Sequence, residues 1–257
     1  MRTVIATRYV TPLREGGSLP AIVEADDDGM YVLKFRGAGQ GAKSLIAELV
    51  AGEIARASGL PVPEIVFVEL DPELARTEPD PEIQDLIRAS AGLNLALDYL
   101  PGSVTFDPIA QKIDAELASC VVWLDAYVTN IDRTPRNTNM LIWHRRLWLI
   151  DHGATLYFHY TWKNYRERSR DPFPAIKDHV LLPFASELQA VDSKMTERLA
   201  PSIISSIIKL IPEAWLVESP FSENTQHRDA YIEYLIHRLE PPHIFLEEAI
   251  RARSHYV

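Results

Sequence analysis

Two aspartates and an asparagine in the middle of the chain have the types and spacing that phosphoryl transfer requires. Asp132 and Asn137 are five positions apart in a polar run, and Asp151 follows fourteen positions later, between an apolar run and a His-Gly pair. This reaction needs a carboxylate that accepts or orients the attacking hydroxyl, and oxygen ligands that hold Mg²⁺ on the phosphates. The spacing matches a kinase catalytic loop followed by an Asp-x-Gly metal-binding motif, with Asn139 as the alternative to Asn137.

The N-terminal third of the chain offers a lysine and a glutamate that complement these groups. In the run Met30–Arg36, strand alternation predicts Val32 and Lys34 on one face, so Lys34 would reach the phosphates while Val32 covers the base. Glu48, in the helix that follows, is the expected ion-pair partner of Lys34. The turn before the first strand could offer backbone N–H groups to phosphate, which adds three candidate nucleotide-binding residues: Gly16, Gly17 and Ser18.

Hydrophobic periodicity and turn residues predict the elements that must hold these side chains. Two strands at 19–25 and 30–36 are expected to form a hairpin about an Asp-Asp-Asp-Gly turn. The segment 69–85, rich in acidic residues and proline, is expected to be a solvated loop or a short irregular helix. The other expected elements are a helix at 45–57, strands at 62–70 and 94–100, a long buried helix at 110–129, a hairpin with strands at 140–143 and 147–150, and helices at 201–210 and 228–239.

The pair Pro101 and Gly102 marks the expected boundary between two parts of the chain. Residues 1–100 are predicted to form a small, strand-rich, nucleotide-binding N-lobe with one helix. Residues 101–257 are predicted to form a larger, mainly helical C-lobe that carries the catalytic loop and one embedded hairpin. This order of elements predicts an α+β fold.

Composition limits the classes of function and the compartment. The chain has 257 residues, 47% of them hydrophobic, and a net charge of -10, which argues against wide non-specific contact with nucleic acid because phosphate binding needs a surplus of lysine and arginine. The single cysteine, Cys120, falls on the apolar face of its helix and is predicted to be a core residue. With no signal-peptide core at the N-terminus and no long uncharged apolar run, we expect a cytoplasmic protein without a membrane anchor.

The motifs resemble those of a known kinase family. The pattern Asn130-x-Asp132-Arg133-x3-Asn137, with an Asp-x-Gly after a short hairpin, resembles the HipA-like kinases and the related phosphatidylinositol kinases. A second stretch, from Glu48 through Ala55 to Gly-Leu-Pro-Val-Pro, is similar to the helix and turn of the HipA-like N-lobe. The resemblance covers most of the chain up to the Asp-x-Gly motif. It implies a bilobal protein-kinase-like fold, the use of ATP and Mg²⁺, and transfer to a hydroxyl, most often of a serine or threonine in a protein.

The same resemblance implies a role for each matching position. Asp132 would be the catalytic base, and Asn137 and Asp151 would be the metal ligands. Lys34 and Glu48 would form the pair that positions the phosphates. The hinge that meets adenine would consist of four consecutive residues: Leu97, Asp98, Tyr99 and Leu100.

Several alternatives stay open at this point. A catalytically inactive kinase-like module that binds a partner would keep the fold, although all of the expected site residues are present. A small-molecule or lipid kinase, or a metal-dependent hydrolase that uses Asp132, Asp151 and His152, would use part of the same set. An antitoxin-like or regulatory protein partner is a further expectation. The aromatic and basic run 157–170, where kinases place their activation segment, would either recognise an acidic substrate through its arginines or form a surface loop anchored by its rings.

Overall fold

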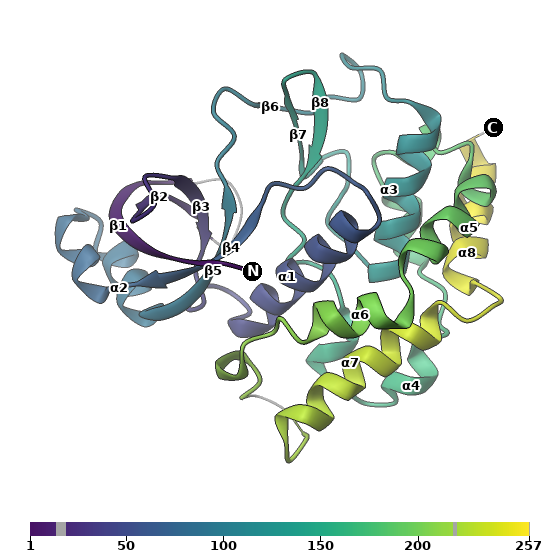
Figure 1. Ribbon diagram of the computed structural model, residues 1–257. Coiled ribbons are helices and arrows are strands. Elements are labelled where there is room, and N and C mark those ends of the chain that lie inside the picture. Colours follow the sequence, from purple (N-terminus) through teal and green to yellow (C-terminus); the bar gives the residue numbers. More distant parts are fainter. Residues whose placement is uncertain (14–18, 218–219, 257) are drawn as a thin grey trace.

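A five-stranded barrel forms the N-terminal part of the chain. The structure is a computed structural model that describes residues 1–13, 19–217 and 220–256. The barrel strands are β1 (Thr3–Pro12), β2 (Ala21–Ala25), β3 (Met30–Lys34), β4 (Ile65–Leu70) and β5 (Gly92–Asp98). Their order is β1-β2-β3-β5-β4, and β1 closes the barrel by pairing parallel with β4 (Figure 1). The predicted hairpin is β2–β3, which turns at the Asp-Asp-Asp-Gly run, where Asp28 has a positive φ of 61°.

The two faces of β3 have different surroundings, as the alternation of its residues predicts. Tyr31 and Leu33 are buried inside the barrel, in a cluster with apolar residues of the other strands. Val32 and Lys34 lie on the other face, opposite Leu97 and Leu95 of β5, respectively. Opposed residues of an antiparallel pair share one face. This second face of the barrel therefore carries Lys34 among apolar side chains.

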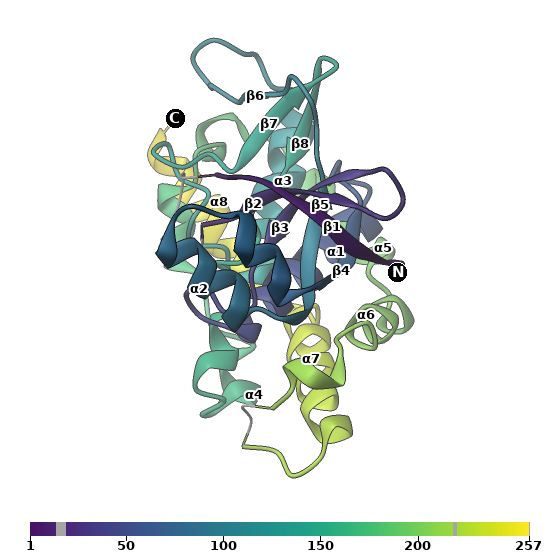
Figure 2. The same ribbon diagram turned by 90° about the vertical axis from the view of Figure 1, so that its left-hand side faces the viewer.

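Two α-helices, rather than the single one predicted, accompany the barrel. Helix α1 (Ala42–Ala57) ends at a glycine with positive φ, as its sequence indicates. Helix α2 (Pro81–Ala89) lies in the segment expected to be a loop or an irregular helix, after the 3₁₀ turn Pro72–Thr77. Asp80 caps α2 by accepting a hydrogen bond from the backbone of Glu82, and two isoleucines of α2 are buried in the same apolar cluster as the barrel interior. Figure 2 shows α2 in front of the strands.

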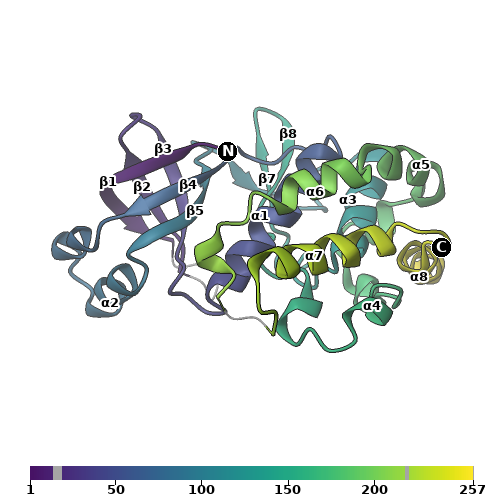
Figure 3. The ribbon, with the colours of Figure 1, turned by 60° about the horizontal axis from the view of Figure 1, so that its bottom comes forward.

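Helices dominate the rest of the chain. A short sheet of β6 (Val104–Thr105), β7 (Met140–Trp143) and β8 (Arg146–Leu149) includes the second predicted hairpin. Figure 3 shows the barrel with α2 on one side and most of the helices on the other. The helices are α3 (Ala115–Val128), α4 (Tyr165–Arg168), α5 (Leu188–Arg198), α6 (Pro201–Ile208), α7 (Asn224–Arg238) and α8 (Ile244–Arg253). Among the described residues of this part, 3₁₀ turns lie at Tyr157–Tyr160, Pro174–Asp178, Leu182–Phe184, Glu213–Trp215 and Ser254–Tyr256.

Helix α3 is the central element of the larger core. Its residues from Ala118 to Val128 are all buried, and Cys120 is among them, as expected. The rings of Trp123 and Tyr127 pack against Phe245 of α8 with centroid distances of 5.2 and 5.7 Å. A helix that is buried on all sides must be surrounded by other elements. Helix α3 therefore provides a rigid base for the loop that follows it.

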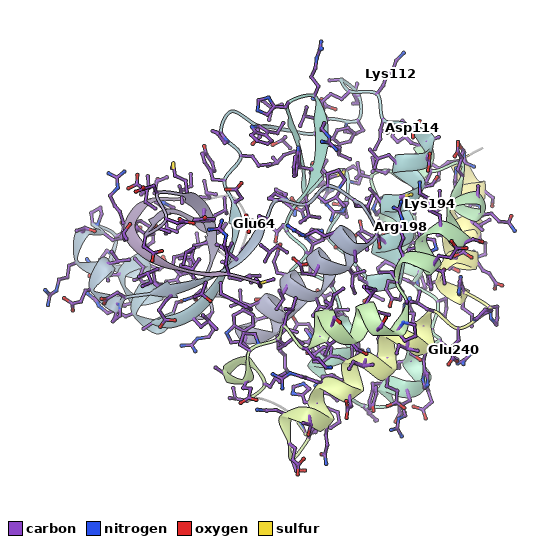
Figure 4. The ribbon with its side chains drawn as sticks, viewed as in Figure 1. Glu64, Lys112, Asp114, Lys194, Arg198 and Glu240 are labelled. Atoms are coloured by element: carbon purple, nitrogen blue, oxygen red, sulfur yellow. The ribbon has the colours of Figure 1, made fainter. Side chains whose placement is uncertain are left out.

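Helix α1 packs mainly with the helical part of the molecule. Its apolar residues belong to the same buried cluster as α3, α5, α6 and α7, together with the outer faces of β4 and β5. Arg198, at the end of α5, donates a 2.5 Å hydrogen bond to the carbonyl of Ser58 at the end of α1 (Figure 4). The division at residue 100 thus does not separate two independent cores, and the two-domain assignment stays a prediction. Within the described ranges, no helix is both long and apolar enough to span a membrane.

Candidate active site

Lys34 lies between two carboxylates that come from distant parts of the chain. Its Nζ donates a 2.6 Å hydrogen bond to Oδ1 of Asp151, which follows β8, and lies 3.6 Å from Oε2 of Glu48 on α1. Lys34 and Glu48 are almost fully buried, whereas the Asp151 side chain is 38% exposed. The structure therefore brings together three of the predicted site residues and leaves one carboxylate open to solvent.

Electrostatics keep this cluster ionised. Burial by itself lowers the pKa of Lys34, but the negative charges of Glu48 and Asp151 together raise that pKa above its ordinary value. Burial raises the pKa of Glu48, and the charge of Lys34 and the contact with His152 outweigh it, so the pKa of Glu48 is lowered. Each buried charge depends on its partners, because an isolated one would be costly in this environment. The lysine is thus held as a cation on the barrel face that meets α1.

Asp132 lies in a tight loop after α3, where two amides bind its carboxylate. Oδ2 of Asp132 accepts a 2.7 Å hydrogen bond from Nδ2 of Asn137 and a 3.2 Å hydrogen bond from Nδ2 of Asn139. The backbone N–H of Asp132 donates to Oδ1 of Asn130 at 3.0 Å. Asn137 is exposed, and Asn139 is buried. Both asparagines considered from the sequence therefore contact Asp132, and the choice of metal ligand between them stays a prediction.

Backbone contacts join the Asp132 loop to the Asp151 strand. The N–H of Ile150 donates to the carbonyl of Asn139 at 3.1 Å, and the N–H of Ile131 donates to the carbonyl of Ala154 at 3.3 Å. Asn139 and Asp151 both have positive φ values, 48° and 55°. A left-handed conformation at a residue other than glycine costs of the order of 1 kcal/mol and concentrates at functional sites. The Asp132 loop and the Asp151 segment therefore meet next to two residues with left-handed backbone conformation, Asn139 and Asp151.

The structure places only some of the predicted nucleotide-binding residues on the barrel face that carries Lys34. Val32 and Leu97 are directly opposed on the barrel face that carries Lys34, where they could cover a base. The N–H groups of Asp98 and Tyr99 donate to the carbonyls of Glu64 and Met30 at 2.8 and 3.0 Å. The carbonyl of Leu100 also accepts the N–H of Ser103 at 3.2 Å, so adenine would need other backbone groups of the predicted hinge. Three predicted phosphate-loop residues lie outside the described residues: Gly16, Gly17 and Ser18.

A buried polar network behind the loop was not predicted from the sequence. Asp125 on α3 accepts hydrogen bonds from Arg133, Asn130 and His179, and all four side chains are buried. An aspartate within the apolar run of α3 was a local signal for such a network, because an unpaired buried carboxylate is unfavourable. His179 gave no such signal, because its partner Asp125 is 54 positions away.

The histidines do not form a metal site of the kind that a hydrolase would need. His152 is fully buried, with Nδ1 3.6 Å from Oε1 of Glu48, so it faces α1 and not the exposed carboxylate of Asp151. No group of three or more His, Cys, Asp or Glu side chains that could hold a metal ion is found in residues 1–13, 19–217 and 220–256. A hydrolase site built from Asp132, Asp151 and His152 is therefore not assembled by this geometry.

The segment after the Asp-x-Gly motif is anchored by rings and by internal ion pairs. Phe158 stacks on Tyr234 of α7 with a centroid distance of 3.6 Å. Arg166 pairs with Glu233 at 2.8 Å, and Arg170 pairs with Glu240. Two of the arginines considered for substrate binding thus have acidic partners within the chain. This arrangement favours the interpretation of the segment as a surface loop anchored by its aromatic rings.

A surface hollow of about 340 Å³ lies between the end of α1 and β8. Arg56, Leu60 and Trp148 are among its lining residues. None of the candidate site residues contributes to it. The candidate site is therefore defined by its side-chain contacts and not by this hollow.

Comparison with known proteins identifies the family. A family model described as HipA-like kinase matches residues 7–245. The fold is similar to the crystal structure of the Helicobacter pylori proinflammatory kinase CtkA, with 14% identity, 99% of each chain covered and a TM-score of 0.56. It is also similar to a Golgi casein kinase with Mn and ADP bound, with 12% identity, 96% of this chain and 74% of that chain covered, and a TM-score of 0.51. No curated protein sequence matches significantly. Because the family model covers most of its length, the chain belongs to the HipA-like kinases and is a kinase with a kinase-like fold.

Proposed function

We propose that this kinase uses ATP and Mg²⁺ to phosphorylate a hydroxyl group, most often of a serine or threonine in a protein, within a bilobal fold. The observation that carries the proposal is the 2.6 Å contact between Lys34 and Asp151, which joins the barrel to the loop after β8. A strand lysine, a helix glutamate and an Asp-x-Gly aspartate are the groups that kinases use to hold nucleotide phosphates and metal. Their convergence from positions 34, 48 and 151 supports phosphoryl transfer over a structural ion pair.

Asp132 has the surroundings of a catalytic base. Its Oδ2 is already bound by the amides of Asn137 and Asn139, so the other carboxylate oxygen is the one to accept the proton of the acceptor hydroxyl. Lys34 would exchange part of its contact with Asp151 for a phosphate oxygen, while Glu48 keeps the ammonium group in place. These steps need only small changes in side-chain contacts.

The donor atoms at the site fit a magnesium ion that is shared with phosphates. Asn137 uses its amide nitrogen for Asp132, which leaves its side-chain oxygen for a cation, and Asp151 uses one carboxylate oxygen for Lys34. Mg²⁺ usually binds through one or two protein oxygens together with phosphates and water, and does not need a cage of protein side chains. When bound, the ion would neutralise charge on the transferred phosphate. Asn137 and Asp151 are the proposed ligands.

An exposed apolar surface next to Asp132 supports a polypeptide acceptor. Ile131 is 43% exposed, and Tyr157 is 41% exposed. Burial and the nearby negative charge of Asp132 raise the pKa of Tyr157, as expected if the phenol lies near this carboxylate. Apolar side chains at the acceptor side favour residues that flank a serine or threonine over a strongly polar small compound.

Transfer of labelled phosphate tests the proposal directly. Purified protein is mixed with γ-labelled ATP, Mg²⁺ and either a degenerate serine/threonine peptide library, lipid vesicles or small alcohols. We expect peptide labelling by the wild type and a loss of roughly 100-fold or more in Lys34→Met and Asp132→Asn. Lys112→Met is the matched control, because Lys112 is an exposed lysine before α3 (Figure 4). Nucleotide binding without labelling of any acceptor would indicate an inactive kinase-like module, and labelling of a lipid or alcohol alone would exclude the protein acceptor.

A further inference from the structure

A single buried carboxylate connects the helix beneath the site to both catalytic segments. Asp125 on α3 is fully buried. Its Oδ1 accepts a 2.9 Å hydrogen bond from Asn130, and its Oδ2 accepts hydrogen bonds of 2.6 Å from Nε of Arg133 and 2.8 Å from Nε2 of His179. Arg133 and His179 outweigh the effect of burial, so the pKa of Asp125 is well below its usual range. The carboxylate is thus a fixed negative charge with three donors.

Through Asn130, this carboxylate restrains the backbone of the proposed base. The side chain of Asn130 donates to Asp125 through Nδ2 and accepts the N–H of Asp132 through Oδ1. The amide of Asn130 therefore has both of its polar atoms engaged. A buried side chain with two such bonds has few alternative rotamers, because any other would leave polar atoms unpaired. The position of Asp132 is therefore tied to α3.

Through Arg133, the same carboxylate restrains the segment that carries Asp151. Nη1 of Arg133 donates to the carbonyl of Asn139 and lies 3.5 Å from the carbonyl of Ile150, the residue before Asp151. The Asn139 carbonyl also accepts the N–H of Ile150. One planar guanidinium thus links Asp125 to the backbone on both sides of the β7–β8 hairpin, which a lysine could not do with its single ammonium.

His179 completes the support from a segment that follows the proposed activation region. Its Nδ1 accepts the N–H of Leu181 at 3.0 Å, which assigns the ring proton to Nε2, the atom that donates to Asp125. The N–H of Val180 donates to the carbonyl of Arg133 at 3.0 Å. The residues 179–181 therefore hold Arg133 by both its backbone and its carboxylate partner.

We infer that Arg133, held by Asp125 and His179, is a positioning residue that sets the distance between the carboxylates of Asp132 and Asp151. This inference rests on the proposed function, since the two carboxylates matter as a base and a metal ligand. A guanidinium that only stabilised the fold would affect the folded fraction of the protein. A positioning role also affects the rate per folded molecule and the order of the segment 130–151.

Conservative variants separate these two roles. We expect Arg133→Lys to lower kcat per folded molecule by roughly 10-fold to 100-fold and to raise the Mg²⁺ concentration needed for half-maximal activity. Loss of a residue that orients metal ligands through hydrogen bonds commonly has effects of this size. His179→Phe should have a similar effect. His179→Gln should keep most of the activity, because its amide can donate to Asp125 in place of Nε2. The folded fraction of each variant is measured by urea unfolding.

Arg238→Lys provides the matched control for loss of a buried guanidinium. Arg238 is buried to a similar extent and donates to four backbone carbonyls, those of Ala126, Tyr127, Ser169 and Asp171. The Arg238→Lys variant should have a lower free energy of unfolding, while its kcat per folded molecule stays within twofold of the wild-type value. A fall in kcat of the same size in Arg133→Lys and Arg238→Lys would overturn the inference, and so would an unchanged kcat in Arg133→Lys.

Hydrogen exchange keeps the two proposals distinguishable. If the wild type transfers no phosphate, the proposed function fails, and the positioning role is then judged from backbone amide exchange of residues 130–151. We expect exchange of this segment to be roughly 10-fold faster in Arg133→Lys and unchanged in Arg238→Lys. Equal exchange in the wild type and Arg133→Lys would overturn the positioning role whether or not the protein is active.

Discussion

Acidification from pH 7 to pH 5 should destabilise the folded protein by about 2 kcal/mol through His159 alone. His159 is fully buried in the 3₁₀ turn after the Asp-x-Gly motif, and its Nδ1 lies 2.9 Å from the hydroxyl of Tyr231. In the described part of the chain, its Nε2 has no hydrogen-bond partner. Burial lowers the pKa of His159 from 6.5 to about 3, and the positive charges of Lys43 and His227 contribute in the same direction.

The sign and size follow from proton linkage. Because the folded-state pKa is lower than the unfolded-state value, the unfolded chain takes up a proton first as the pH falls. The stability contribution is therefore present above pH 6.5 and is lost progressively below it, down to the folded-state pKa of about 3. With a fully protonated unfolded state, the loss is about 1.4 kcal/mol per pH unit. Since protonation is incomplete near pH 6.5, the interval from pH 7 to pH 5 gives roughly 2 kcal/mol.

Urea unfolding at both pH values, in the wild type and in His159→Asn, measures this contribution. An asparagine amide can take the place of Nδ1 against Tyr231 and does not titrate. The difference between the two proteins cancels the contributions of titrating groups that lie far from His159 and do not interact with it. We expect the wild type to lose roughly 2 kcal/mol more than the variant. Losses that agree within about 0.5 kcal/mol would refute the reasoning.

Three further predictions concern the site and the turn after α1. Asp132→Asn should lower kcat by roughly 10²-fold to 10⁴-fold without weakening ADP binding, which calorimetry can check. Glu48→Gln removes one of the two carboxylates that hold Lys34, and should lower kcat/KM for ATP by roughly 10-fold to 100-fold in steady-state assays. Gly59→Ala should lower the free energy of unfolding by more than about 1 kcal/mol, because Gly59 has a φ of 79° and an added Cβ would lie 2.5 Å from Nη1 of Arg198, which would have to move away from the carbonyl of Ser58. Gly102 also has a positive φ, but an added Cβ there would meet open space, so Gly102→Ala should lower the free energy of unfolding only through the strained backbone conformation. Equal losses of stability in the two variants would contradict the argument that an added Cβ at Gly59 displaces Arg198.

The elements whose structure depends mainly on residues close together in the sequence could be predicted. The β2–β3 hairpin follows from alternating residues around an Asp-Asp-Asp-Gly turn, and α3 follows from a long apolar run. Helix α2 was not distinguished from a loop, although Asp80 and Pro81 are typical of a helix start, because the acidic and proline-rich segment 69–85 fits a loop or a short irregular helix equally well. The pairing of β1 with β4 joins residues more than 60 positions apart, and local periodicity does not specify such a partner.

In the candidate site too, local sequence patterns indicated some of the contacts, and contacts between distant segments were not predictable. Asp132 and Asn137 were expected in one polar loop, and the structure joins their side chains by a 2.7 Å hydrogen bond that the spacing did not specify. The pair of Lys34 and Glu48 was expected from strand and helix periodicity, and the two side chains do lie 3.6 Å apart. The link from His179 to Asp125 depends on how a loop returns to α3, which no local pattern reports. The placement of some candidate residues could therefore be predicted from short patterns, but the buried side chains that support them could not.

The balance of charge at the site explains why nucleotide and metal should bind together. The carboxylates of Glu48 and Asp151 both lie beside the single ammonium of Lys34, and Asp132 adds a third carboxylate in the neighbouring loop, while Arg133 is already paired with Asp125 behind that loop. Such a site is anionic and should repel a free triphosphate, because like charges at short distance are unfavourable where water is partly excluded. A divalent cation carried by the nucleotide reverses that balance. For the proposed ATP-dependent reaction, we therefore expect metal-bound ATP, and not free ATP, to be the form that binds.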